Sequence, residues 1–488
     1  MSQINISNLT FSYEGSYDNI FEDVSFRIDT DWKLGFTGRN GRGKTTFLNL
    51  LLGKYHYSGS IETNTSFTYF PYDVPDKSMI TLEVLESIYP NYEYWKLRRE
   101  LNALAIQEDC LYRPFITLSN GEQTKLLLAI MFMSENNFLL IDEPTNHLDL
   151  AGRELVSRYL NGKSGFILVS HDRAFLDGCV DHILSINNAN ITVTKGNFST
   201  WLENKARQDA FELAENEKLM DQIAHLGAAA ARNAEWSDRL EATKIGGGPC
   251  DRGAVGAKSA KLMKRSKAIE KRRKDAIEEK SKLLKNIERS EKLKIHNLDY
   301  HSRRYIELKG VSIEYDRKEV CSGVSFTIEP GDRIALRGRN GSGKSSILKL
   351  ICGERIPFKG SFIRGSQLSI SYVPQDTGAL AGSLSGYAQS RGIDESLFMT
   401  ILRKLNFSRV QFEKDIKDFS GGQKKKVLIA GSLCERAHLY VWDEPMNYID
   451  VISRIQIENL LLDFQPTILF VEHDKAFCDR IATKIIEL

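Results

Sequence analysis

Two nine-residue stretches decide the fold: residues 38–46 read GRNGRGKTT and residues 338–346 read GRNGSGKSS. Both satisfy the pattern G-x-x-x-x-G-K-[ST], in which backbone N–H groups curl around phosphates, the lysine reaches the terminal phosphates and the hydroxyl ligates Mg²⁺. A strand-like run precedes each loop and an apolar, helix-like run follows it, so each loop opens a helix, where anions bind. The candidate phosphate-contacting residues are Gly38, Asn40, Gly41, Gly43, Lys44, Thr45 and Thr46 in the first copy and Gly338, Asn340, Gly341, Gly343, Lys344, Ser345 and Ser346 in the second.

Three further motifs repeat in the same order at nearly the same offset of 300 to 302 residues. LSNGEQ around Ser119 returns as FSGGQ around Ser420, LLIDEPTNHLD returns as YVWDEPMNYID, and LVSHDRAFLD returns as FVEHDKAFCD. Four motifs in one order indicate that a whole domain is duplicated. We therefore expect an α/β fold with two phosphate-binding domains, at 1–200 and 301–488.

In both copies an apolar, strand-like run ends in two acids: Asp142 and Glu143 in the first, Asp443 and Glu444 in the second. Phosphoryl transfer to water needs one carboxylate near the metal, here Asp142 or Asp443. It also needs a second carboxylate that polarises the attacking water, here Glu143 or Glu444. A lone acidic pair is more often surface charge, but the position directly after an apolar strand favours the catalytic interpretation.

A histidine follows another apolar run in each copy, at His171 and His473. Such a histidine can contact a γ-phosphate and hold the attacking water in line. One histidine alone would more often be structural, whereas its repetition favours a functional role. Orientation and phosphate sensing are favoured over proton abstraction.

The segment between the two copies, 201–300, is rich in Lys, Glu, Ala and Arg. Apolar residues recur in it at helical spacing, which predicts an antiparallel helical hairpin with a glycine-rich tip at about 244–267. From Arg252 to Lys274 there are ten Lys or Arg and one acid, a net +9 in a chain whose total is +2. Charged helices are usually just solvated, but a charge of this density indicates a phosphate-binding surface. The candidate RNA-binding residues are Lys258, Lys261, Lys264, Arg265 and Lys267.

Composition narrows the class of protein. No run of about 18 apolar residues exists, so we expect no membrane span. The first residues, MSQINISNLTFSYEG, lack the pattern of a secretory signal, so we expect a cytoplasmic protein. The seven cysteines are scattered singly, which argues against a disulfide framework and a zinc site.

With these motifs in this order, both copies resemble the ATP-binding cassette ATPases. The resemblance implies that the cassettes pair head to tail within one chain and hold two ATP molecules with Mg²⁺ between them. Thr45, Ser345, Asp142, Asp443 and Gln375 would hold the metal. Each phosphate loop would face the serine and glycine of the other cassette's signature segment, which are Ser119, Gly121, Ser420 and Gly422. Tyr13 and Tyr315 would stack on adenine, although either could instead be a core aromatic residue.

Two fused cassettes with a helical linker of about 100 residues resemble the ABC-F proteins, which act on ribosomes. The linker is implied to enter the ribosomal E site, against large-subunit rRNA and peptidyl-tRNA, and to point towards the peptidyl-transferase centre. The segments DWKLGFTGRNGRGKTT and LSNGEQTK, with the long tip, resemble the antibiotic-resistance branch and within it the Lsa-type proteins. That resemblance implies ribosomal protection against lincosamide, streptogramin A or pleuromutilin drugs, with ATP hydrolysis driving release.

The two copies also depart from the family pattern. Tyr72 stands in YFPY where a magnesium-contacting glutamine is expected, whereas the second copy keeps Gln375 in YVPQ. Asn120 replaces the first signature glycine, and Met446, Tyr448 and Ile449 depart from EPTNHLD. We therefore expect two unequal ATP sites.

Two other functions remain open from the sequence. A housekeeping ABC-F translation factor that relieves stalled ribosomes would share this body. The ATPase subunit of a transporter would need membrane partners, and a basic hairpin between cassettes has no role in it.

Overall fold

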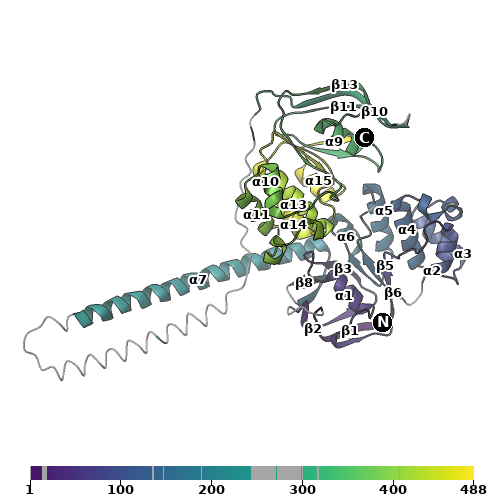
Figure 1. Cartoon of the computed structure of the whole chain (residues 1–488). Helices are drawn as coiled ribbons and strands as arrows, with labels where there is room; N and C mark the ends of the chain where they lie inside the picture. Colours follow the sequence, from purple (N-terminus) through teal and green to yellow (C-terminus); the bar gives the residue numbers. More distant parts are fainter. Residues whose placement is uncertain are drawn as a thin grey trace, which may run out of the picture. The chain divides into compact units, whose positions relative to one another are not determined.

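The computed structural model describes residues 2–13, 19–134, 137–146, 148–187, 190–242, 271, 298, 300–315, 318–405 and 407–488. Contacts divide the chain into two compact units. One unit is Met1–Ser199 together with Lys292–Leu488, and it holds both cassettes. The other is Thr200–Glu291. In the described part of the second unit, helix α7 (Phe198–Ala242) runs without a break for 45 residues (Figure 1).

The first cassette is built on a six-stranded sheet in the order β5-β6-β7-β3-β8-β9. Its inner strands read as short apolar runs such as FILV, because helices cover both faces of a parallel sheet. Strand β9 is antiparallel and closes one edge. The strands are β3 (Lys33–Thr37), β5 (Ser66–Phe70), β6 (Asn137–Asp142), β7 (Phe166–Val169), β8 (His182–Asn187) and β9 (Asn190–Lys195).

A three-stranded antiparallel sheet, β2-β1-β4, completes the strands of this cassette. Its strands are β1 (Gln3–Phe11), β2 (Phe21–Asp29) and β4 (Ser58–Glu62). The helices begin at polar caps: the side chains of Ser119, Asp149 and Asp172 accept from backbone N–H groups of the first turn of α4, α5 and α6. The helices are α1 (Lys44–Leu51), α2 (Thr81–Ile88), α3 (Tyr94–Ala103), α4 (Asn120–Met131), α5 (Leu150–Asn161) and α6 (Arg173–Cys179), with 3₁₀ turns at Glu108–Tyr112 and Phe115–Thr117.

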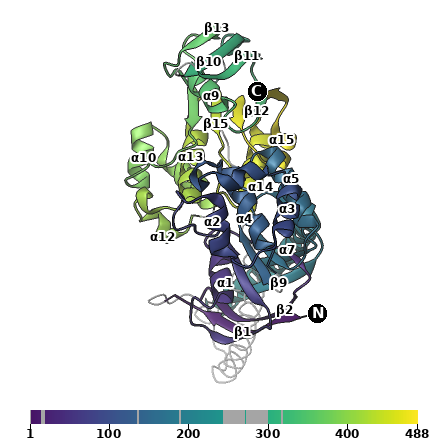
Figure 2. The same ribbon diagram turned by 90° about the vertical axis from the view of Figure 1, so that its right-hand side faces the viewer.

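The second cassette repeats this plan with a five-stranded parallel sheet, β14-β15-β16-β12-β17, and an antiparallel sheet, β11-β10-β13. In both views the antiparallel sheet lies beside α9 at one end of this cassette, and α10 and α13 lie away from it (Figure 2). The strands are β10 (Ile306–Tyr315), β11 (Lys318–Ile328), β12 (Arg333–Arg337), β13 (Phe358–Arg364), β14 (Ile370–Val373), β15 (Leu439–Asp443), β16 (Ile468–Val471) and β17 (Lys484–Glu487). The helices are α9 (Lys344–Cys352), α10 (Leu384–Arg391), α11 (Glu395–Lys404), α12 (Arg409–Phe412), α13 (Gly421–Cys434), α14 (Val451–Phe464) and α15 (Lys475–Ile481), with a 3₁₀ turn at Ile416–Asp418.

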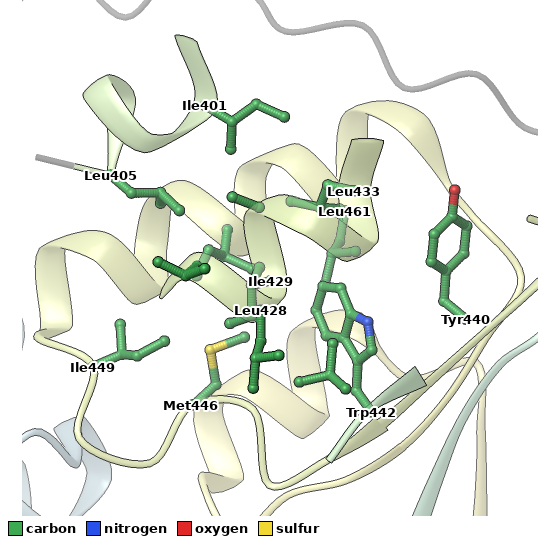
Figure 3. Packing of buried hydrophobic residues seen from close by; sticks show 14 of the residues in the cluster. Ile401, Leu405, Leu428, Ile429, Leu433, Tyr440, Trp442, Met446, Ile449 and Leu461 are labelled. Atoms are coloured by element: carbon green, nitrogen blue, oxygen red, sulfur yellow. The ribbon is translucent and has the colours of Figure 1, made fainter. Parts of the chain in front are cut away.

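A large apolar core joins sheet and helices in the second cassette. Trp442 of β15 is fully buried against α13, and Met446 packs beside it, next to Leu428 and Ile429 (Figure 3). Burying a large apolar side chain contributes roughly 1.5–3 kcal/mol. This core therefore fixes β15, and with it the acids at its carboxyl end, against the helix that carries the signature segment.

Candidate functional site

Both phosphate loops have the backbone that the glycine pattern predicts. Gly43 and Gly343 lie at the N-caps of α1 and α9 with φ of 96° and 86°, a left-handed conformation that glycine tolerates. A Cβ atom on Gly43 would lie 2.6 Å from a methyl carbon of Ile20. The Nζ atoms of Lys44 and Lys344 donate to loop carbonyls, at 2.7 Å to Gly38 O and 2.9 Å to Gly338 O. Burial lowers the pKa of both lysines.

A cavity of about 790 Å³ brings the second phosphate loop together with the signature segment of the first cassette. The second cassette lines it with Lys344, Gln375, Glu444 and His473. The first cassette supplies Ser119, Asn120, Gly121, Glu122, Lys125, Asn146, Leu148, Asp149, Gly152 and Arg153, and the second also supplies Val320, Arg339, Asn340, Gly341, Gly343, Ser345, Ser346 and Asn447.

The first phosphate loop meets the signature segment of the second cassette more closely. Asn40 Nδ2 donates to the carbonyl oxygen of Tyr448 at 2.7 Å. A Cβ atom on Gly422 would lie 2.3 Å from that same oxygen and 3.3 Å from Asn40 Nδ2. Tyr448 has a left-handed φ of 64°, which is unusual for a residue with a side chain. The structure thus places a phosphate loop of each cassette beside the signature segment of the other.

The aspartates that end β6 and β15 lie beside the loop hydroxyls. Thr45 Oγ1 donates to Asp142 Oδ2 at 3.1 Å, and burial raises the pKa of Asp142. In the second cassette burial raises the pKa of Asp443, while a hydrogen bond from Ser345 opposes that shift. Asp443 Oδ1 is buried and makes no hydrogen bond within the described part of the chain. An unpartnered carboxylate oxygen beside a hydroxyl fits a hard cation such as Mg²⁺.

Both glutamates after these aspartates have left-handed backbone, with φ of 50° at Glu143 and 46° at Glu444. Such strain persists only where surrounding contacts fix it, and it is concentrated at functional sites. The N–H of Glu143 donates to Val169 O at 2.9 Å, and the N–H of Glu444 donates to Val471 O at 3.0 Å. Each glutamate side chain lies close to the histidine of its own cassette. His171 Nε2 lies 3.3 Å from Glu143 Oε1, and His473 Nε2 lies 3.5 Å from Glu444 Oε1.

The surroundings of the two glutamates differ. Gln375 Nε2 and Asn447 Nδ2 donate to Glu444 Oε2 at 2.8 and 2.7 Å. Burial opposes ionisation of Glu444, but hydrogen bonds from His473 and Gln375 outweigh it and lower its pKa. Glu143 Oε1 is buried without a hydrogen-bond partner among the described residues. Burial, reinforced by the charge of Asp142, raises the pKa of Glu143 to about 8.

Tyr13 and Tyr315 are 43% and 40% exposed, so neither is a core aromatic residue. The hydroxyl of Tyr13 lies 2.8 Å from Thr46 Oγ1, at the start of α1. Its ring packs edge-on against Tyr55, with ring centroids 5.8 Å apart. An exposed ring beside the phosphate loop is compatible with stacking on a nucleotide base.

Some residues around these sites were not identified from the sequence. Tyr69 OH donates to Asp142 Oδ2 at 3.1 Å, and Tyr372 holds the matching place near Asp443. The repeat of a tyrosine two residues before Pro71 and Pro374 is a signal that could have found this pair. The buried ion pairs Arg153–Asp172 and Arg454–Asp474, both at 2.9 Å, repeat in the same way.

The basic residues Lys258, Lys261, Lys264, Arg265 and Lys267, like the whole expected tip at 244–267, lie outside the described residues. Within the described ranges no helix is long and apolar enough to cross a membrane. The same ranges contain no group of three or more His, Cys, Asp or Glu that could hold a metal ion.

Comparison with known proteins agrees with this geometry. The family described as "ABC transporter" matches residues 21–146 and 321–447. The putative ATP-binding protein YdiF of Bacillus subtilis is 28% identical over 96% of this chain and 78% of its own length. The ribosome protection protein VmlR of the same organism is 27% identical over 96% of this chain and 84% of its own length. ABC transporter F family member 2 of Arabidopsis thaliana is 24% identical over 100% of this chain and 76% of its own length.

Among solved structures, the archaeal ribosome recycling factor aABCE1 has a similar fold, with a TM-score of 0.64 at 19% identity over 98% of this chain and 87% of that one. Two phosphate loops, each beside a signature segment, define an ATPase made of two α/β nucleotide-binding domains. The chain belongs to the ATP-binding cassette family.

Proposed function

We propose that the protein is a ribosome-bound ATPase that protects the ribosome from antibiotics of the lincosamide, streptogramin A or pleuromutilin class. The observation that carries this is that two cassettes share a composite cavity and are separated in the sequence by the long helix α7 and a stretch of net charge +9. The likeness to a ribosome protection protein over 96% of the chain supports it.

The proposed ATPase chemistry follows from the described side chains. Lys44 and Lys344 would hold the terminal phosphates in place of the loop carbonyls that they now contact. Glu143 and Glu444 would polarise the attacking water, with His171 and His473 fixing its direction. Mg²⁺, when bound, neutralises developing phosphate charge. Its ligands would be Thr45 and Asp142 in the first site, and Ser345, Asp443 and Gln375 in the second.

The remaining candidate residues would complete each site across the cassette interface. Ser119 and Gly121 would contact the nucleotide held by the second phosphate loop, and Ser420 and Gly422 the one held by the first. Serine hydroxyls and helix N-termini favour anionic groups, and both serines cap their helices, α4 and α13. Tyr13 and Tyr315 would stack on the adenine rings.

We propose domain limits of 1–200 and 301–488 for the cassettes and 201–300 for the linker. ATP binding would draw the cassettes together and fix the direction of the linker, whose tip would reach from the E site towards the peptidyl-transferase centre. Lys and Arg there would displace counterions from rRNA phosphates, a salt-dependent contribution. Drug displacement would follow from this insertion, and hydrolysis would then release the protein.

The test uses the full chain with Glu143→Gln and Glu444→Gln together. This variant should bind ATP without hydrolysing it and should co-sediment with ribosomes when ATP is present. Replacing Lys261, Lys264, Arg265 and Lys267 with Gln should reduce the salt sensitivity of that binding. A trapped variant that sediments free of ribosomes in ATP contradicts the ribosomal function.

A second candidate is a housekeeping translation factor of the same family, because YdiF, which is not named as a protection protein, is as similar to this chain as VmlR is. Expression in a susceptible cell separates the two functions. Ribosomal protection predicts higher tolerance of a lincosamide or a pleuromutilin. Ribosome binding with unchanged tolerance would favour the housekeeping function.

A further inference from the structure

A buried carboxylate links the two cassettes outside the ATP sites. Glu458, in the middle of α14, is fully buried, and Arg173 of the first cassette donates to both of its oxygens, with Nη1 at 3.2 Å from Oε2. Arg480 of its own cassette also donates to Oε2, at 2.9 Å. A buried charge is costly unless it is paired, so this contact between residues 285 positions apart is part of the packed interface.

Arg173 belongs to the segment that holds the first-site histidine. It is the first residue of α6 and follows His171 by two positions. Asp172 between them caps α6 and is fixed by Arg153 Nη1 at 2.9 Å. His171 Nε2 in turn lies 3.3 Å from Glu143. A displacement of Arg173 should therefore also move His171, because only Asp172 lies between them and its side chain is hydrogen-bonded to α6 and to Arg153.

The partner helix α14 carries three charges on one face. Asp450, Arg454 and Glu458 are spaced four residues apart, so they lie along one side of the helix. Asp450 pairs with Lys426 of the signature helix α13 at 2.9 Å, and Arg454 pairs with Asp474, next to His473, at 2.9 Å. The face of α14 that contacts Arg173 is therefore also bonded to two other elements of the second cassette. One is the signature helix α13, through Asp450 and Lys426, and the other is the segment that carries His473, through Arg454 and Asp474.

The corresponding contact, from the second cassette to α5 of the first, is much weaker than the Arg173–Glu458 pair. Lys475 stands where Arg173 does in the repeat, and its Nζ lies 3.5 Å from Glu154, with both side chains about half exposed (51% and 53%). Ser157 takes the place of Glu458 on α5 and donates to Phe175 O inside its own cassette. An exposed pair of this kind contributes little, because solvent and salt screen it. Among the described residues, the segment that follows His171 is therefore held by a buried charge of the other cassette, whereas the segment that follows His473 is not.

We propose that Arg173 is a positioning residue: its pairing with Glu458 of the opposite cassette holds His171 in place, so that hydrolysis at the first ATP site depends on cassette pairing more strongly than hydrolysis at the second. The proposal goes beyond the ribosomal function and rests on the roles proposed for Glu143 and Glu444.

The experiment measures ATP hydrolysis by the full chain in two backgrounds. Glu444→Gln leaves the first site to report, and Glu143→Gln leaves the second. Methionine in Arg173→Met fills the space of the arginine methylene groups, and Arg480 still donates to Glu458. We therefore expect this variant to keep its fold. In the first background Arg173→Met should lower kcat about tenfold with KM changed less than about twofold. In the second background kcat should change less than about twofold. Arg173→Lys should restore part of the loss.

Lys475→Met is the matched control, and it should change kcat less than about twofold in either background. Glu458→Gln should reproduce the loss caused by Arg173→Met in the first background. Equal losses in both backgrounds, or none in the first, would overturn the proposal. So would a first site that fails to hydrolyse ATP even in a single turnover with protein in excess. Residual hydrolysis by the double Glu→Gln protein would instead show that the carboxylate roles are wrong, independently of Arg173.

Discussion

Gln375 donates from Nε2 to Glu444 Oε2 at 2.8 Å, whereas Tyr72, at the matching place in the first cassette, makes no such bond to Glu143 within the described residues. Asn447 adds a second donor to Glu444 at 2.7 Å. The second glutamate is therefore held ionised and oriented, while burial raises the pKa of the first to about 8. The two candidate ATP sites therefore differ in the surroundings of the carboxyl group that we propose polarises water.

This difference predicts unequal turnover at the two sites. At pH 7 Glu444→Gln should remove most steady-state ATPase activity, at least about tenfold, because an oriented general base contributes roughly 10²–10⁴-fold. Glu143→Gln should lower it less than about threefold, since among the described residues Glu143 lacks the two amide donors that orient Glu444. The measurement is phosphate release at saturating ATP. Equal losses in the two single variants would contradict the inequality.

Two neighbouring glycines of the second signature segment should behave differently. A Cβ atom at Gly422 would lie 2.3 Å from Tyr448 O, the carbonyl oxygen that accepts a hydrogen bond from Asn40 Nδ2. A Cβ atom at Gly421 would make only an ordinary contact, 3.7 Å from the ring of Tyr448. Gly422→Ala should therefore push the first phosphate loop away and lower first-site hydrolysis in the Glu444→Gln background. Gly421→Ala should leave it within about twofold, as alanine is accepted in a helix.

The readout for this pair is ATP hydrolysis together with a thermal melt. Gly422→Ala should lose hydrolysis without losing its melting transition, because the clash with Tyr448 O lies in a loop of the second cassette that faces Asn40, and not in the apolar core. A Gly422→Ala protein as active as Gly421→Ala would show that the approach of Asn40 to Tyr448 is not needed for first-site turnover.

The motifs predicted much of these sites, and the reasons for the gaps are physical. Loop geometry at Gly43 and the strand before Glu143 are local, so the pattern of glycines and apolar residues was enough. The pair Arg173–Glu458 joins residues 285 positions apart and depends on how the two cassettes pack, which no local pattern encodes. Tyr69 was missed because a tyrosine in a strand is usually a packing residue.

A buried lysine beside Asp443 should matter for stability. Lys425 is 1% exposed, and its Nζ donates to Pro374 O at 2.8 Å and to Asp443 O at 3.3 Å. Lys425→Met would leave both carbonyls without that donor, at a cost of roughly 1–3 kcal/mol. Urea unfolding should show the loss in the second cassette. Lys424→Met, at a partly exposed neighbour, should cost less than about 0.5 kcal/mol. Equal costs for the two variants would exclude this role.

A carboxylate in the first cassette should make folding stability depend on pH. Glu100 is 1% exposed and accepts from Lys163 Nζ and Tyr159 OH, both at 2.6 Å. Burial opposes its ionisation, but hydrogen bonds from Lys163, Tyr159 and Arg99 outweigh that and lower its pKa. A folded-state pKa below the unfolded value of about 4.3 means that this carboxylate stabilises the fold above that pH and stops doing so as pH falls through the folded pKa.

Glu100→Gln should therefore destabilise the first cassette by about 2 kcal/mol at pH 7, the usual loss for hydrogen bonds to a charged group. The difference from the wild-type protein should shrink as the pH falls below the unfolded value of about 4.3, because the unfolded carboxyl binds a proton first and the native one follows at its lower pKa. Thermal melts at pH 7, 5, 4 and 3 measure this difference. Glu93→Gln is the control, because Glu93 is 54% exposed and its pair with Lys96 is screened by solvent. A Glu100→Gln deficit that stays constant over this range would show that Glu100 acts by packing and not by its charge.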